Sequence, residues 1–192
     1  MKKLAYLALL GAAALSAQTI VLDLDPAQSE VEFVVGSTLH TVHGNFHLKR
    51  GAIRFDADTG KAEGELVVDA TSGASGSAAR DRRMHKEILQ SDRYPEIVFR
   101  PDRVEGKVAA EGPSQVQLHG IFSIHGGDHE MTVPVDVQSA AGEYTATAHF
   151  VVPYIKWGMK NPSTFVLRVS DKVEITVHTT ARRAKQTALN RD

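Results

Sequence analysis

Hydrophobic and polar residues alternate along most of the chain after Thr19. In the segment 116–124, every second residue is apolar or glycine, and the positions between them are mostly polar. The segments 31–35, 131–137 and 173–177 follow the same rule. A period of two is typical of β-strands that bury one face. Because turn-forming clusters separate many of these segments, the pattern predicts about ten antiparallel strands and an all-β protein.

The alternation stops once, at a loop of Gly, Ser and Ala residues at 72–77. In the residues that follow, Met84 and Ile88 are four positions apart among charged residues. This spacing is typical of an amphipathic helix, and a Tyr-Pro pair at 94–95 would end it. We therefore expect one short helix near residues 78–89, after which the strand pattern resumes.

The two ends of the chain differ from the rest. Near the N-terminus, two lysines precede an uncharged apolar run at 4–14, which small residues follow. This arrangement is typical of a secretory signal, and the run is shorter than the roughly 20 residues that cross a bilayer. We predict a cleaved signal peptide at 1–17, one folded domain at 18–180 and a polar tail at 181–192. The mature protein would be periplasmic or secreted, with no stable membrane span.

Composition narrows the choice of partner. The chain has 22 Lys and Arg against 23 Asp and Glu, a net charge of −1. This balance shows no electrostatic footprint for nucleic acid or an anionic membrane. The chain has no cysteine, so burial alone must stabilise an exported fold that other proteins reinforce with disulfides.

Strands with one apolar face can pack as a sandwich or close into a barrel. Closure removes exposed edges, which would make long valine-rich strands prone to aggregation. A sandwich with a filled interior buries alternate residues equally well. The alternation by itself therefore leaves both architectures open.

Further motifs lie in four segments spread over the chain. They are the strand pair FVVGSTLHTVHGNF (33–46), the Arg-Asp helix and Tyr-Pro strand RDRRMHKEILQSDRYPEIVF (80–99), the hairpin HGIFSIHGGDHEMTVPVDV (119–137) and the segment FVVPYIKWGMKNPSTFVLRVSDKVEITV (150–177). In this order they resemble the YceI family of lipid-binding, lipocalin-like proteins. The chain differs from the family pattern at 128–130, where Asp-His-Glu replaces a Thr-Lys region, and at Tyr154, where Arg is common.

The resemblance implies an antiparallel lipocalin-like β-barrel of about eight strands, with an apolar tunnel and a helical segment near one end. It further implies a bound isoprenoid or similar amphiphile, such as an isoprenoid quinone, a polyprenyl chain or a fatty-acid derivative. The differences from the family pattern leave the identity of the head group open.

Two sets of residues are candidates for contact with such a ligand. Large inward-facing side chains would line the tunnel, and we expect them to be Phe33, Val35, Phe46, Phe99, Phe122, Met131, Phe150 and Phe165. The small inward-facing residues Gly120, Ala146 and Ala148 would leave space beside them. Polar or amphipathic side chains would surround the head group at the mouth, and we expect these to be His40, Arg80, His85, Tyr154 and Trp157.

Nine histidines raise the question of a metal site. His125 and His129 flank a Gly-Gly-Asp turn and are able to approach each other. Two ligands with no cysteine or glutamate-rich set beside them make a weak site. We therefore predict no physiological metal and no cofactor other than the lipid, and leave weak metal binding by this pair open.

The most chemically mixed cluster is on the predicted helix, where Asp81 and His85 are one turn apart and able to form a hydrogen bond. A role of this cluster with Arg80 in docking the helix to the barrel is favoured over a role at a head group. The chain has no recognisable catalytic motif. The leading hypothesis is non-catalytic storage or transport of a lipid. An enzyme acting on an apolar substrate and a filled-core interaction protein are the alternatives, and a homodimer is left open.

Overall fold

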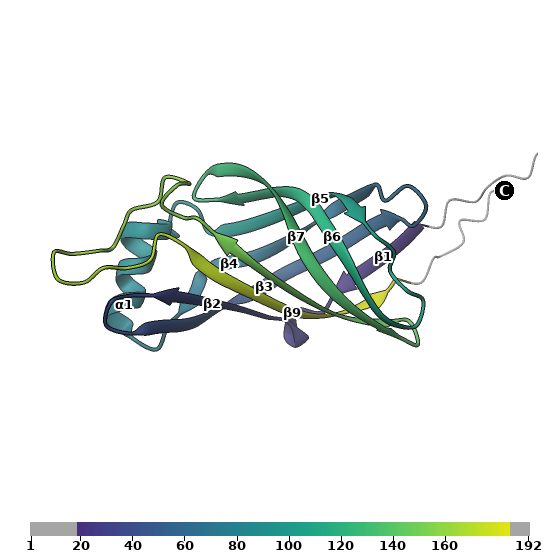
Figure 1. Cartoon of the computed structure of the whole chain (residues 1–192), viewed down its shortest axis with the longest axis horizontal. Coiled ribbons are helices and arrows are strands. Elements are labelled where there is room, and N and C mark those ends of the chain that lie inside the picture. Colours follow the sequence, from purple (N-terminus) through teal and green to yellow (C-terminus); the bar gives the residue numbers. More distant parts are fainter. Residues whose placement is uncertain (1–18, 185–192) are drawn as a thin grey trace, which may run out of the picture.

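The computed structural model describes residues 19–184. In it the chain folds into a barrel of antiparallel strands with a helical segment across one end (Figure 1). The elements in chain order are β1 (Thr19–Leu24), η1 (Pro26–Gln28), β2 (Glu30–Gly36), β3 (Thr41–Asp56), β4 (Ala62–Ala74), α1 (Ala78–Arg83), η2 (Met84–Leu89), β5 (Glu96–Glu105), β6 (Gly112–Ile124), β7 (Gly127–Ala140), β8 (Glu143–Val152) and β9 (Val173–Arg183).

The nine strands occupy eight positions around the barrel. β2 pairs with residues 41–46 of β3 and with residues 174–178 of β9. β1 pairs with residues 52–56 of the same β3 and with residues 181–183 of the same β9. β1 and β2 are therefore consecutive parts of one interrupted position, and the predicted eight-stranded antiparallel barrel is confirmed.

The interruption between β1 and β2 has a local cause. The side chain of Asp25 accepts a hydrogen bond from the backbone N–H of Ala27 at 2.9 Å, and Pro26 begins the short helix η1. Proline fixes the backbone and has no N–H for a sheet ladder, so the strand cannot continue through it. The hydroxyls of Ser29 and Thr179, 2.7 Å apart, join the chain to β9 where β2 begins.

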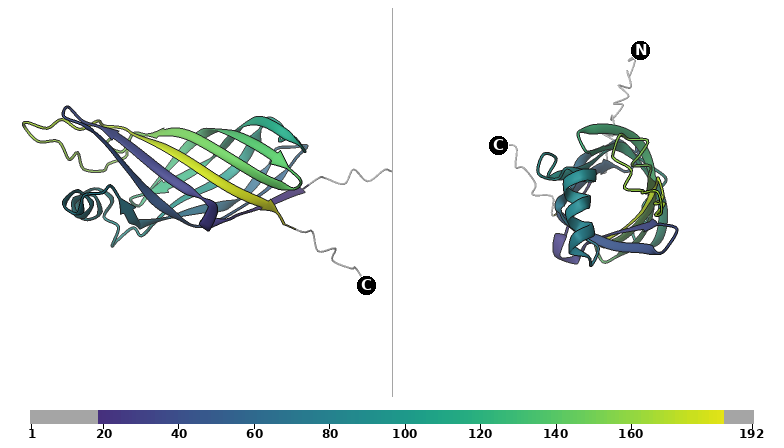
Figure 2. Two further views of the ribbon diagram at one scale, coloured as in Figure 1. Left: turned by 90° about the horizontal axis from the view of Figure 1, so that it is seen from below. Right: turned by 90° about the vertical axis from the view of Figure 1, so that its left-hand side faces the viewer.

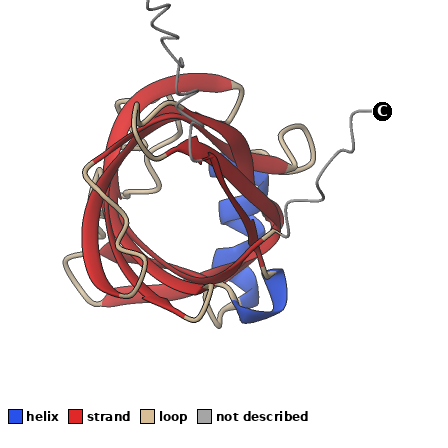
Figure 3. Ribbon diagram, turned by 90° about the vertical axis from the view of Figure 1, so that its right-hand side faces the viewer, coloured by secondary structure: helices blue, strands red, loops and turns tan. Residues whose placement is uncertain are grey.

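Closure distinguishes the barrel from a sandwich. Each described strand has a hydrogen-bonded neighbour along both edges, because β1 and β2 pair with β9 while β3 pairs with β4. The strands form a ring when the molecule is viewed along its long axis (Figure 3). Side chains therefore alternate between an inner and an outer surface, and in β7 buried and exposed residues alternate without exception from Val133 to Ala140.

The predicted helix near 78–89 is confirmed, with one change of geometry. Residues Ala78–Arg83 are α-helical, whereas Met84–Leu89 form a π-helix that ends at Gln90, with φ of 50°. Leu89 is buried, so this second part packs against the end of the barrel. Figure 2 shows the helix lying across one end of the barrel, at the side of the ring. Within residues 19–184, none of the helices has the length and apolar character that crossing a bilayer requires.

The C-terminal part of the chain departs from the pattern at two places. The alternating run 165–169 lies in a loop, with one isolated bridge between Ser37 and Val169. β9 continues to Arg183, and Ala181 is buried. Residues 181–183 therefore belong to the barrel rather than to the predicted polar tail. The predicted signal peptide at 1–17 and residues 185–192 lie outside the described residues.

Gly120 lies against the backbone of the neighbouring strand β5 and does not leave space in the tunnel, contrary to the prediction. A Cβ atom on Gly120 would lie 2.2 Å from the carbonyl oxygen of Arg100 and 2.7 Å from the Cα of Pro101. β5 bulges between Pro101 and Arg103, and this brings its backbone against β6. Glycine is required here because no side chain fits between the two strands.

We therefore expect Gly120→Ala to lower the free energy of unfolding by about 1–3 kcal/mol, as overpacking does in other cores. Gly36→Ala is the matched control, because nothing lies within 4 Å of the added Cβ. It should change stability by less than about 1 kcal/mol. Urea denaturation of both variants measures the difference, and equal stabilities would contradict this role of Gly120.

Candidate functional site: an apolar tunnel through the barrel

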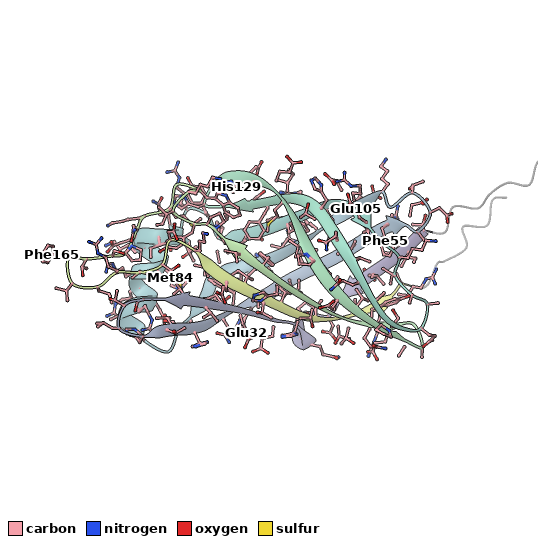
Figure 4. The ribbon with its side chains drawn as sticks, in the orientation of Figure 1. Glu32, Phe55, Met84, Glu105, His129 and Phe165 are labelled. Carbon is pink, nitrogen blue, oxygen red and sulfur yellow. The ribbon has the colours of Figure 1, made fainter. Side chains whose placement is uncertain are left out.

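A cavity of about 670 Å³ runs through the barrel. Phe55 lines it near the end where β1 begins, and Met84 lines it near the helical end. Figure 4 shows these two side chains at opposite ends of the barrel. The cavity is therefore a tunnel along the barrel axis rather than a pocket at one end.

The tunnel wall follows directly from the period-two pattern. Val133, Val135 and Val137 of β7 line it, and so do Val116, Leu118, Phe122 and Ile124 of β6. Ala146 and Ala148 line it on β8 and add little bulk, as their small size predicts. Inward positions that alternate between branched aliphatic and small residues leave a continuous apolar space, because side chains from opposite walls do not meet.

Most of the predicted tunnel residues lie where the alternation places them. The cavity is lined by Phe33, Val35, Phe46, Phe99, Phe122 and Phe150. Phe33 and Phe46 contact each other across the β2–β3 pair, with ring centroids 5.3 Å apart. Their contact with a ligand stays a prediction.

Two predicted tunnel residues lie elsewhere. Met131 packs between the two hydrophobic clusters of the wall without lining the cavity. Phe165 is 97% exposed and lies at the tip of the molecule (Figure 4). The reason is a turn: the N–H of Thr164 donates to the carbonyl of Leu167 at 2.8 Å, so the local alternation does not belong to a strand. Leu167 itself lines the cavity.

The polar residues of the lining are concentrated at the helical end. Thr179 lies along the wall, where its hydroxyl pairs with Ser29. Tyr144 lines the cavity within the cluster around Phe55, away from the helical end. The others, at the helical end, are Ser37, His40, Ser75, Ser77, Arg80, Arg83 and Tyr154. The tunnel is thus mostly apolar over its length, most of its polar lining is at one mouth, and the charged side chains that line this mouth are arginines.

Three of the five predicted mouth residues line the cavity and two do not. His40, Arg80 and Tyr154 line the cavity, as expected of residues near a head group. His85 is directed away from it, with its ring nitrogens 3.0 Å from the Ser91 hydroxyl and 2.8 Å from the Gly73 carbonyl oxygen. His85 therefore fixes the π-helix to the end of β4, which agrees with the docking role favoured from the sequence.

The expected hydrogen bond between Asp81 and His85 does not form. Asp81 instead accepts hydrogen bonds from the backbone N–H and the hydroxyl of Ser75. Arg80 donates to the hydroxyl and the carbonyl of the same Ser75, both at 2.7 Å. The loop before the helix takes these partners because it folds back over the first helical turn, which the spacing of residues in a helix does not indicate.

Trp157, the other predicted mouth residue that does not line the cavity, packs against the barrel wall beside the mouth. Its ring stacks on His129, with centroids 4.0 Å apart and planes 4° apart, and it contacts Phe122 at 5.7 Å. Phe122 and His129 are paired across β6 and β7. Burial lowers the pKa of His129, against an opposing effect of the Asp128 carboxylate. The neutral form of the imidazole is therefore favoured in this stack.

The histidines at the β6–β7 turn serve aromatic packing. His125 lies 5.1 Å from the ring of Tyr94, while Asp128 accepts a hydrogen bond from Ser123 on the outer surface. Among residues 19–184, no three His, Cys, Asp or Glu side chains are placed to hold a metal ion.

Some residues of the site were missed from the sequence. Arg83 lines the mouth beside Arg80, and its position three residues further along the helix was the available signal. Met159 lines the cavity from a segment with no periodicity, where no signal existed. Lys160 of this segment bonds Glu87 of η2 at 2.6 Å, which lowers the pKa of the Glu87 carboxyl. This ion pair joins the long loop 153–172 to the helical segment.

The fold and the tunnel agree with comparisons to known proteins. A family model described as a YceI-like domain matches residues 22–181. The chain belongs to the YceI-like domain family. No curated protein matches the sequence.

Solved structures resemble this YceI-like protein at low sequence identity. BcnA from Burkholderia cenocepacia is 19% identical with a TM-score of 0.68, and the match covers 82% of this chain and 99% of BcnA. A polyisoprenoid binding domain from Saccharophagus degradans, described as implicated in plant cell wall breakdown, is 15% identical with a TM-score of 0.67, covering 85% and 98%. A YceI protein from Campylobacter jejuni is 15% identical with a TM-score of 0.60, covering 76% and 86%. At these identities the likeness establishes the fold.

The His129–Trp157 stack generates a pH prediction for this YceI-like protein. Because burial lowers the folded-state pKa of His129, the neutral form stabilises the fold above the ordinary histidine pKa of about 6.5. That stability decreases as the pH falls below this value. Trp157 is the single tryptophan, so its fluorescence should change with a midpoint below about 6.5, and His129→Phe should abolish the transition.

His119→Gln is the control for this titration. His119 lies on the outer wall, with its ring nitrogens 2.6 Å from Asp102 and 3.0 Å from Glu130. The hydrogen bond with Asp102 raises the pKa of His119, so its titration occurs on the other side of the ordinary value. A fluorescence transition that survives in His129→Phe but disappears in His119→Gln would contradict the assignment.

Proposed function

We propose that this protein binds one long-chain amphiphile of the isoprenoid type, with the tail along the tunnel and the head group at the helical mouth. The observation that carries the proposal is a continuous apolar tunnel of about 670 Å³ whose polar lining is concentrated at one end. This volume lies within the range of about 300–1,000 Å³ typical of ligand sites. The same cavity contradicts the filled-core alternative.

The energetics favour a long apolar tail. Each methylene group taken from water contributes about 0.8 kcal/mol, whereas association costs about 4–15 kcal/mol once. A chain of many carbons therefore binds through its length, with few polar contacts. A short or globular apolar ligand would leave much of the tunnel wall without contacts.

The mouth favours a head group that accepts hydrogen bonds. Arg80 and Arg83 are both donors only, and His40 adds a ring nitrogen. The hydroxyl of Tyr154 already donates to the Ser170 carbonyl at 2.7 Å, so it offers an acceptor rather than a donor. Carbonyl or phosphate oxygens, as in a quinone or a polyprenyl phosphate, match the arginine pair.

The proposal extends to the setting of the protein. The description of the Saccharophagus degradans structure as a polyisoprenoid binding domain supports an isoprenoid-type ligand. The apolar run at 4–14, preceded by two lysines, supports export to the periplasm or beyond. We propose non-catalytic storage or transport of the lipid in that compartment.

Blocking the tunnel should reduce binding. Ala146→Phe places a ring inside the cavity, whereas Thr145→Phe places the same ring on the exposed outer face of β8. Excluding even two methylene groups weakens binding by roughly tenfold. Native mass spectrometry and solvent extraction of freshly purified protein measure the bound lipid. Lipid-free wild-type protein with no affinity for added isoprenoid quinone would overturn the proposed function.

The mouth arginines should select the head group. Arg83→Gln removes a guanidinium that lines the cavity, and Arg82→Gln removes its exposed neighbour, which does not line it. We expect Arg83→Gln to weaken binding of a quinone or prenyl phosphate by roughly tenfold, the equivalent of one charge-assisted hydrogen bond. Neither variant should change the affinity for a plain hydrocarbon of equal length, measured by Trp157 fluorescence. Equal effects on both ligands would contradict a head-group role.

A further inference from the structure

Three of the four large hydrophobic side chains that the described structure exposes lie at the tunnel mouth. Phe165 is 97% exposed, Val166 79% and Leu39 72%, and we call these three residues the mouth tip. The fourth, Val151, is 44% exposed on β8 of the barrel wall. Figure 4 shows Phe165 at the far end of the molecule, beyond the helical segment. Large apolar side chains in this position mark an interaction surface.

Hydrogen bonds hold the two loops of the mouth tip together. The N–H of Thr38 donates to the Arg168 carbonyl at 2.9 Å, and the N–H of Arg168 donates to the Thr38 hydroxyl at 3.3 Å. The N–H of Ser170 donates to the Gly36 carbonyl at 2.8 Å. Leu39 and Phe165 are therefore presented by one joined structure. Leu167 of the same loop lines the cavity, so the exposed tip is continuous with the tunnel.

The mouth is also the basic end of the protein. The segments that form it, 37–40, 75–95, 125–127 and 153–172, contain nine Lys and Arg and four Asp and Glu, a charge of +5. Residues 19–184 hold 18 Lys and Arg and 22 Asp and Glu, a charge of −4, so the described residues outside the mouth carry −9. The mouth and the rest of the described barrel therefore have charges of opposite sign, which the near-neutral total of the sequence did not indicate.

We infer that the mouth docks on the surface of an anionic lipid bilayer. The mouth tip enters the region below the head groups, and the surrounding lysines and arginines contact anionic lipids. A second copy of the chain fits this face less well, because two ends of charge +5 repel each other. The tunnel then opens onto the hydrocarbon of the membrane, and an apolar ligand can pass between the two without crossing water. This last consequence rests on the proposed function, whereas docking itself does not.

The test is co-sedimentation of the protein, stripped of lipid, with vesicles of phosphatidylcholine alone or mixed with phosphatidylglycerol. We expect binding to the anionic vesicles that decreases as salt is raised. The triple variant Leu39→Ser, Phe165→Ser, Val166→Ser should reduce the partition coefficient at least tenfold. Val151→Ser, which removes an exposed valine from the barrel wall, should leave it unchanged.

A second pair of variants tests the charge. Lys156→Gln with Arg168→Gln removes two charges from the mouth, and Lys61→Gln with Lys107→Gln removes two exposed charges elsewhere on the barrel. Only the first pair should weaken binding to anionic vesicles. All proteins compared carry the same N-terminus, so the apolar run at 4–14 contributes equally to each.

Three results would overturn the inference. One is unchanged vesicle binding by the triple variant, and another is equal binding to neutral and anionic vesicles. The third is a wild-type dimer in sedimentation velocity that the triple variant converts to a monomer. The triple variant should keep the wild-type affinity for a quinone in detergent solution, because none of its three residues lines the tunnel. Loss of docking and loss of lipid binding are therefore measured separately.

Discussion

Closure of the hydrogen-bonded ring is the constraint on which the rest of the structure depends. The ring closes where the interrupted position formed by β1 and β2 pairs with β9 on one side and β3 on the other. Each described strand then has partners on both edges, so backbone hydrogen bonding is complete around the wall. Because the hydrogen bonds between strands run around the whole circumference, the wall can be stable around an interior that side chains do not fill.

The packing of the wall shows how this works. Two hydrophobic clusters lie along the barrel, one around Phe55 and Tyr144 and the other around Phe46 and Tyr154. Inward side chains contact their neighbours on adjacent strands within these clusters, and residues of both clusters line the tunnel. Tight contacts between backbones occur at positions such as Gly120, where β5 and β6 approach too closely for a side chain. The same closure that excludes water from the wall thus creates an interior suited to a long apolar chain.

The proposed function rests on the difference between the two ends. At the end where β1 begins, apolar residues such as Leu22 and Ala181 line the tunnel. At the other end, the helical segment and the loop 153–172 bring arginines to the lining and join through the Glu87–Lys160 ion pair. The polarity of the tunnel defines the direction in which an amphiphile would enter. Exposed apolar side chains and positive charge at the same end are consistent with a surface that receives such a ligand from a membrane.

The sequence by itself determined the all-β class, the single helical segment and the inward face of nearly every strand. A period of two specifies which side chains share a face, and this is a local property of the extended backbone. It therefore placed Phe33, Phe99 and Phe150 on the tunnel wall. It did not decide between a sandwich and a barrel, because both bury the same alternate residues; the resemblance to YceI proteins, rather than the pattern, indicated closure.

Only the tertiary structure decided the features that depend on distant segments. Gly120 belongs to the wall because of a bulge in β5, and Phe165 is exposed because hydrogen bonds between residues 164 and 167 turn a short alternating run into a loop. Asp81 pairs with Ser75 rather than with His85 because the preceding loop folds back on the helix. The charge of the mouth comes from two segments that lie far apart in the sequence, 75–95 and 153–172. Alternation specifies which face of its own strand a residue occupies, whereas a tunnel mouth forms where the ends of several strands and the loops between them meet in space.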